Sequence, residues 1–112
     1  VGRDSDVAET IFEEAVALAK AGCFCVVLEC VPSELARRIT DAISVPTIGI
    51  GAGKDCDGQV LVINDMLGMY DKLSPKFVRR YADLRGVIGN AVLEFKKDVE
   101  NNNFPSENES FN

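Results

Sequence analysis

The chain has 112 residues, with 12 Lys and Arg against 18 Asp and Glu, which gives a formal charge of −6. That length fits one small domain or a piece of a larger one. The acidic balance argues against a nucleic-acid-binding module, because phosphate binding needs a basic face. The chain contains no histidine, which excludes Ser-His and Cys-His nucleophile pairs and any His-ligated metal site. No apolar run approaches the roughly 20 residues that span a membrane, and no signal peptide is recognised, so we expect no membrane partner.

Three of the four cysteines, Cys23, Cys25 and Cys30, fall inside one apolar run, and Cys56 lies farther along the chain. Their spacing departs from the C-x₂₋₄-C pairs that are typical of zinc sites. We therefore interpret them as core thiols rather than as metal ligands, disulfides or redox groups. Free thiols are typical of a reducing compartment, so we expect a cytoplasmic protein.

The first predicted element is an amphipathic helix over residues 4–21, because its apolar residues recur at spacings of three and four. Asp4 or Ser5 can cap its start, and Gly22 stands where a left-handed residue ends a helix. Residues 24–31 then form a strand that is apolar on both sides except at Glu29. This pattern is typical of a parallel sheet covered by helices.

A second helix begins at Pro32 and is closed by residues 44–46, and a second strand follows over residues 47–50. Strand, helix and strand within about 30 residues predict a βαβ unit with a right-handed crossover. Residues 51–58 are a glycine-rich loop. We predict a third strand over residues 59–63 and a turn or short helix over residues 64–68.

Ser74 and Pro75 form a typical helix start, so we predict a helix there and, after a break near residues 83–85, a second helix. These elements predict α/β architecture that is not closed, whereas a βα barrel takes about 250 residues. We expect residues 1–100 to be the C-terminal portion of a single larger domain that has additional C-terminal helices. An N-terminal remainder of the same protein would complete it. Residues 101–112 are polar and should form an extended or mobile tail.

Glu29 is the leading candidate for a catalytic residue. It lies near the C-terminal end of an apolar strand, where parallel α/β folds bind ligands and barrels project catalytic groups. Burial would raise the pKa of its carboxyl group, which suits a general base or acid that works near neutral pH. A structural glutamate paired with a Lys or Arg of a neighbouring strand is the alternative.

Three other sets of residues could contribute chemistry, and each has a simpler explanation. The glycines at positions 49, 51 and 53 follow a strand and could cradle a phosphate, but they do not open a helix as the dinucleotide fingerprint requires, so close backbone packing explains them better. Asp55, Asp57 and Asp65 could ligate a hard cation, although turns and caps use aspartate more often. Basic clusters are interpreted as solvated helix faces or subunit contacts: Lys76, Arg79, Arg80, Lys96 and Lys97.

Several ordered motifs resemble the ketopantoate hydroxymethyltransferase family. They are Leu-Glu-Cys-Val-Pro at 28–32, Pro-Thr-Ile-Gly-Ile-Gly-Ala-Gly at 46–53, Cys-Asp-Gly-Gln-Val-Leu-Val at 56–62, Asp-Met-Leu-Gly at 65–68 and Pro-Lys-Phe-Val-Arg-Arg-Tyr-Ala-Asp at 75–83. Phe104-Pro105 and Ser110-Phe111 resemble the family's tail. Asn64 and Glu109 depart from it, since many members carry His or Tyr at the first position and often His at the second.

The resemblance implies a (βα)₈ barrel of the phosphoenolpyruvate mutase-like superfamily. It implies transfer of a hydroxymethyl group from 5,10-methylenetetrahydrofolate, the co-substrate, to the 2-oxo acid 3-methyl-2-oxobutanoate, which forms ketopantoate (2-dehydropantoate) for pantothenate and coenzyme A biosynthesis. It also implies a Mg²⁺ ion that stabilises the enolate, Glu29 as the base that takes the C3 proton, and glycines that leave room for the substrate. Family members form homo-oligomers.

The same resemblance implies that the family's metal ligands fall outside this chain, because none of Asp55, Asp57 or Asp65 matches them. The fragment alone should therefore be inactive, and no residue is assigned to the folate. One alternative is another Mg²⁺-dependent, enolate-forming lyase of the same superfamily, which the Glu-Cys-Val-Pro motif disfavours. The other is a non-catalytic binding or assembly fragment in which Glu29 is structurally paired.

Overall fold

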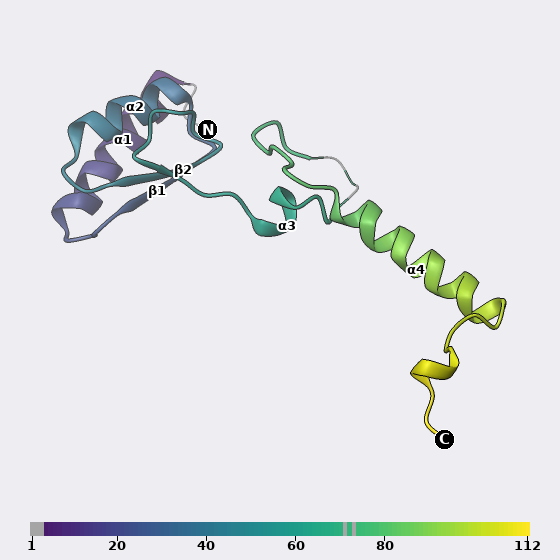
Figure 1. Ribbon diagram of the computed structural model, residues 1–112. Helices are drawn as coiled ribbons and strands as arrows, with labels where there is room; N and C mark the ends of the chain where they lie inside the picture. The colour runs from purple at the N-terminus through teal and green to yellow at the C-terminus, as the bar shows by residue number, and fades with distance from the viewer. Residues whose placement is uncertain (1–3, 71, 73) are drawn as a thin grey trace. The chain divides into compact units, whose positions relative to one another are not determined.

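A computed structural model describes residues 4–70, 72 and 74–112. Contacts within the chain divide it into two units, which are coloured by residue number in Figure 1. Unit 1 comprises Val1–Val62 and Pro75–Val78, and unit 2 comprises Ile63–Ser74 and Arg79–Asn112. Each unit is described separately below.

Unit 1 contains the βαβ unit that the sequence predicts. Its elements are α1 (Ser5–Lys20), β1 (Val26–Glu29), α2 (Ser33–Ala42), β2 (Thr47–Ile50) and β3 (Gly58–Gln59). The three strands form one sheet in the order β1-β2-β3, and both pairings are parallel. The α/β class, the first two helices and the second strand are thereby confirmed.

Two strands are shorter than predicted. The first covers four residues of the predicted range 24–31, and β3 covers only Gly58 and Gln59 instead of residues 59–63. Beyond that pair, the Val60 amide still donates to the Gly49 carbonyl at 3.0 Å, and α3 begins at Ile63. The runs of apolar residues therefore predict strands that are too long, because the length of a strand is set by its regular ladder of hydrogen bonds.

The ends of α1 follow the predicted chemistry. Asp4 is the N-cap, and its carboxylate accepts a hydrogen bond from the Asp6 amide at 2.9 Å, which satisfies one of the free donors of the first turn. Gly22 follows the C-cap with a φ of 105°, a conformation that glycine adopts without a Cβ penalty.

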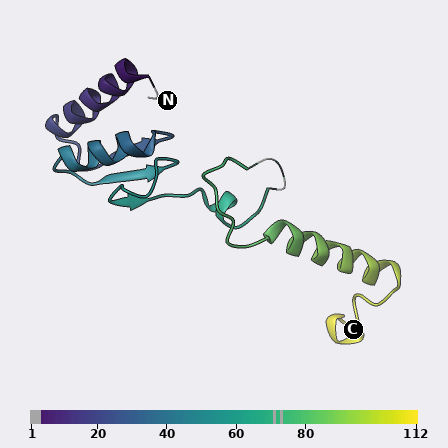
Figure 2. The same ribbon diagram turned by 90° about the horizontal axis from the view of Figure 1, so that it is seen from above.

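Both helices of unit 1 lie on the same side of the sheet in Figures 1 and 2. Burial alternates along β1, where Val26 and Leu28 are buried while Val27 and Glu29 are exposed. The buried pair belongs to the single core cluster of the described residues: Ala15, Val26, Leu28, Val31, Leu35, Ala36, Ile39 and Ala52. The prediction of a sheet covered on both faces is therefore not met within the described residues, and Glu29 lies on the uncovered face.

A side-chain contact joins α1 to α2. The Arg38 guanidinium on α2 donates to the Glu9 carboxylate at 2.9 and 3.2 Å, and it lies 4.0 Å from the centre of the Phe12 ring. The hydrogen bond from Arg38 lowers the pKa of the Glu9 carboxyl group. The same bond raises the pKa of Arg38.

Unit 2 contains α3 (Ile63–Met66), α4 (Leu84–Glu100) and the 3₁₀ turn η1 (Glu107–Glu109). The turn or short helix predicted over residues 64–68 is a short helix that begins one residue earlier, and the second of the two predicted C-terminal helices is confirmed. Asp83 caps α4, since its carboxylate accepts from the Gly86 amide at 3.3 Å. None of the described helices is both long and apolar enough to cross a membrane.

The helix predicted to begin at Ser74 and Pro75 is wrong, because residues 74–83 form no helix. The Tyr81 amide donates to the Met66 carbonyl at 2.7 Å, and the Leu84 amide donates to the Leu67 carbonyl at 2.9 Å. The Ser74 hydroxyl accepts from Arg80 at 2.8 Å. The segment therefore contains a single turn, in which the Val78 amide donates to the Pro75 carbonyl at 3.1 Å, and its bond from Tyr81 to Met66 joins it to a residue distant in sequence.

The tail beyond α4 contains local structure that its polar composition does not predict. The Phe104 ring meets Phe95 of α4 edge-on, with ring centres 5.3 Å apart. Ser106 and Glu109 form a reciprocal capping box around η1. An aromatic contact and a capping box therefore give this exposed segment a turn.

Candidate functional site

Glu29 is the last residue of β1, and its register partner on β2 is Ile50, the last residue of that strand. Both therefore lie at the carboxyl edge of the sheet, as predicted. The Glu29 side chain is exposed, so the burial that we expected from the apolar run is not found in the described part of the chain. Within that part, its carboxylate has no ion-pair partner, and the structural pairing offered as the alternative is not seen.

Cys30 directly follows Glu29, the last residue of β1. Its φ is 53°, which is unusual for a residue with a Cβ atom. Its amide still donates to the Ile50 carbonyl at 2.9 Å. Such backbone strain is often found at functional sites, and here it turns the chain off the sheet one residue after the candidate base.

The glycines at positions 49, 51 and 53, the first within β2 and the others after it, make room for side chains of the chain itself. A Cβ atom on Gly49 would lie 2.7 Å from the Cys56 sulfur, one on Gly51 would lie 2.9 Å from Phe77 Cδ2, and one on Gly53 would lie 2.5 Å from the Ser33 Cβ. Close packing is therefore the explanation that the structure supports. The room for substrate that the resemblance implies at these glycines is occupied by residues 33, 56 and 77.

Two of the three candidate metal ligands have other partners, and the third belongs to the other unit. The Asp57 carboxylate accepts from the Thr47 amide at 2.9 Å, and Asp55 pairs with Lys54 at 3.1 Å. Asp65 belongs to α3 in the other unit. The described residues contain no group of three or more Cys, Asp or Glu side chains that could hold a metal ion.

A network that sequence reasoning missed ties the loop after β2 to the start of that strand. Thr47 is fully buried, and its hydroxyl lies 2.8 Å from that of Thr40 on α2 and accepts from the Asp57 amide at 3.1 Å. A threonine at the first position of an apolar strand was the available signal, since buried hydroxyls require partners.

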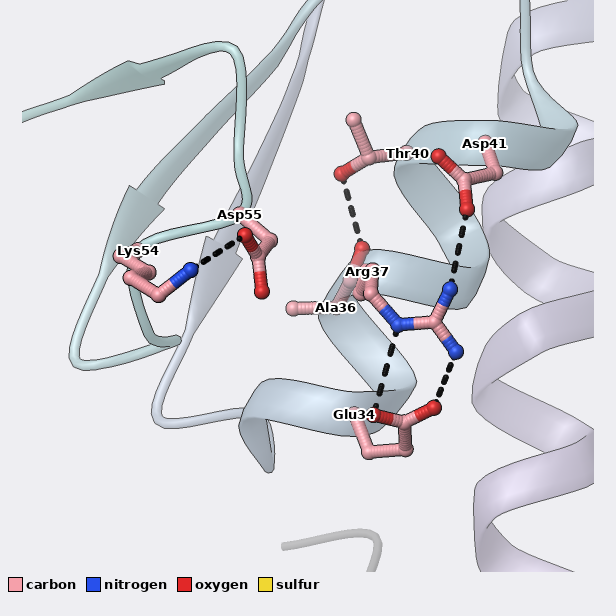
Figure 3. A network of polar contacts seen from close by, with 7 residues as sticks. All are labelled: Glu34, Ala36, Arg37, Thr40, Asp41, Lys54 and Asp55. Carbon is pink, nitrogen blue, oxygen red and sulfur yellow. Dashed lines mark hydrogen bonds and ion pairs between the residues drawn. The ribbon is translucent and has the colours of Figure 1, made fainter.

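Charged side chains line the outer surface of α2, as Figure 3 shows. Arg37 pairs with Glu34 and with Asp41, the latter at 3.2 Å. The hydrogen bond from Arg37 lowers the pKa of Glu34, and the positive charge of Arg37 acts in the same direction. These groups are exposed, so we assign them to the helix surface and not to catalysis.

The remaining candidates are also surface groups. The five basic residues of the predicted clusters are exposed, and Arg79 lies 5.9 Å from the Tyr81 ring centre.

All four cysteines are free. Cys56 is partly buried against the core cluster, whereas Cys30 is exposed, so the interpretation as core thiols is wrong for Cys30.

Comparison with known proteins gives a consistent result. The family model described as "Ketopantoate hydroxymethyltransferase" matches residues 1–107. A protein of Syntrophomonas wolfei named 3-methyl-2-oxobutanoate hydroxymethyltransferase is 58% identical over 110 residues, which are 98% of this chain and 40% of that relative. Proteins of the same name from Nitratidesulfovibrio vulgaris strain DP4 and Syntrophus aciditrophicus are 52% and 53% identical over 98% of this chain. The chain spans 36–40% of the length of these curated relatives.

Proposed function

The chain belongs to the ketopantoate hydroxymethyltransferase family, and we propose that the protein containing it transfers a hydroxymethyl group from 5,10-methylenetetrahydrofolate to 3-methyl-2-oxobutanoate. The observation that carries this proposal is Glu29, a carboxylate with no ion-pair partner among the described residues, at the carboxyl edge of parallel strands in a chain that matches the family over residues 1–107. We further propose that the βαβ unit is part of a (βα)₈ barrel, in which that edge holds the active site.

Glu29 acts in this proposal as the general base. Its carboxylate takes the proton from C3 of the 2-oxo acid, and the electron pair of the broken C–H bond moves into the enolate. The enolate carbon then forms a bond to the one-carbon unit of the folate, and water supplies the oxygen of the new hydroxyl group. Both C–N bonds between that carbon and the folate break, and tetrahydrofolate leaves. Its two nitrogens take up one proton from the water and the proton that Glu29 removed. Side-chain general bases contribute factors of about 10² to 10⁴ to such steps.

The Mg²⁺ ion that the resemblance implies does not fit the described residues of this chain, because they offer no cluster of ligands. We therefore propose that residues outside the described ones hold it, and we derive no step through it here. We also propose that the rest of the protein binds the folate, because this chain spans only 36–40% of the length of its relatives.

Exchange of the C3 proton tests the proposal without the folate. A full-length polypeptide that carries this sequence is incubated with 3-methyl-2-oxobutanoate in D₂O, and loss of the C3 proton signal is followed by NMR. We expect Glu29→Gln to slow the exchange by about 10² or more, because the amide cannot accept the proton.

The matched control is Glu34→Gln, which makes the same change in an exposed residue of α2. We expect it to leave the exchange rate unchanged. Exchange at the wild-type rate in a folded Glu29→Gln protein would contradict the role of Glu29 as the base. It would favour the alternative in which this residue is not catalytic.

A further inference from the structure

The chain returns to the carboxyl edge of the sheet through a short segment. It leaves unit 1 after Val62 and rejoins it at Pro75–Val78. Within this segment the Phe77 ring lies over Gly51, so closely that a Cβ atom on that glycine would be 2.9 Å from Phe77 Cδ2 and 3.1 Å from Cγ. An aromatic ring is therefore seated directly on the backbone at this point.

Gly51 fits this contact for two independent reasons. Its φ is 67°, which disfavours residues with a Cβ atom. It also leaves the space that the Phe77 ring fills. The close approach therefore depends on both members of the pair, a glycine without a side chain and a flat aromatic ring.

The contact lies at the same edge as Glu29. Gly51 directly follows Ile50, which is the register partner of Glu29, and the Ile50 carbonyl accepts from the amide of Cys30, the residue after Glu29. Phe77 retains 39% of its accessible surface. Part of an apolar ring thus stays available to a ligand at the edge that carries the candidate base.

We propose that Phe77 is a specificity-determining residue, whose ring on Gly51 forms an apolar wall for the branched carbon chain of the 2-oxo acid. This inference rests on the function proposed above. The substrate presents polar oxygens at C1 and C2 and methyl groups beyond C3, so an apolar wall distinguishes it from unbranched 2-oxo acids by the methyl group that they lack. In a hydrophobic pocket one such carbon changes kcat/KM by about 10- to 200-fold.

The test compares two 2-oxo acids in the full-length polypeptide, 3-methyl-2-oxobutanoate and the unbranched 2-oxobutanoate. Exchange of the C3 proton in D₂O gives kcat and KM for each acid. We expect Phe77→Ala to reduce the preference for the branched acid by about tenfold, mainly through a higher KM. Phe77→Leu, which keeps an apolar side chain, should restore most of the preference. The control Phe111→Ala removes a fully exposed ring of the tail and should retain the wild-type ratio.

Each outcome decides between the two proposals. If the wild-type protein exchanges neither acid, the proposed function fails and this inference fails with it. If the wild-type protein exchanges both acids but Phe77→Ala keeps the wild-type ratio of kcat/KM, only the role of Phe77 is overturned. Should Phe77→Ala not fold, the polar variant Phe77→Gln takes its place: the same loss of preference is expected, and a wild-type ratio in folded Phe77→Gln overturns the role of Phe77 equally.

Discussion

Cys30 holds a conformation that few residue types adopt, directly beside the proposed base. Its φ of 53° lies in the left-handed region, where a branched Cβ collides with the backbone. We expect Cys30→Val to lower the free energy of unfolding, because a branched Cβ adds to the cost of about 1–2 kcal/mol that every residue with a Cβ atom already meets in this region. Cys30→Asn is the matched control, because asparagine tolerates positive φ. Urea unfolding measures both, and equal losses in the two variants would contradict the strain at this position.

Glu29 and Phe77 show what residue-level reasoning can and cannot find. A single carboxylate in an apolar strand is visible in the sequence, so the candidate base could be named before the structure was known. The exposure of its side chain could not be predicted, because it depends on which elements cover that face of the sheet. Phe77 gave no signal either, since its partner Gly51 lies 26 positions earlier and only the fold brings them together.

At the scale of elements, the helix ends that depend on residues close in sequence are predicted correctly. The first helix has its cap at Asp4 and its left-handed stop at Gly22, and both are in place. No helix follows the Ser74-Pro75 start although it carries the usual cap signal, and farther along the same predicted helix the Tyr81 amide bonds to the Met66 carbonyl of α3. Propensity is a weak prior where a competing non-local partner exists.

The link between α1 and α2 has a pH dependence whose sign follows from the pKa shift. Arg38 lowers the pKa of Glu9, so the pair stabilises the folded state above about pH 4.5 and loses that contribution as the pH falls through the lower folded value. Titration of the Glu9 carboxyl followed by NMR should give a pKa below 4.5 in the wild-type chain. In Arg38→Gln it should rise towards 4.5, whereas Arg37→Gln should not move it. An unchanged value in Arg38→Gln would contradict the pairing.

At the scale of the whole molecule, burial is unevenly distributed between the elements of the chain. All eight residues of the buried hydrophobic cluster come from residues 15–52. Helix α4 has 17 residues and none of them is buried, although it carries large apolar side chains that are exposed: Val87, Ile88, Val92, Leu93, Phe95 and Val99. Most of the stability of helices in proteins comes from packing of an apolar face, and α4 has no buried residue that would supply it. The local stability of the 112-residue polypeptide should therefore differ strongly along its sequence.

Amide hydrogen exchange of that polypeptide tests the difference. We expect amides of β1, β2 and α2 to be protected more strongly than those within α4, because the former open only when the core cluster opens. Ile39 is fully buried in that cluster, so Ile39→Ala should cost about 2–5 kcal/mol there and should reduce protection in β1 and β2. Protection within α4 should stay as low as before, since its amides already exchange through local fraying. If α4 is as strongly protected as β2 in the wild-type polypeptide, burial of side chains does not determine local stability in this chain, and another contact must stabilise the helix.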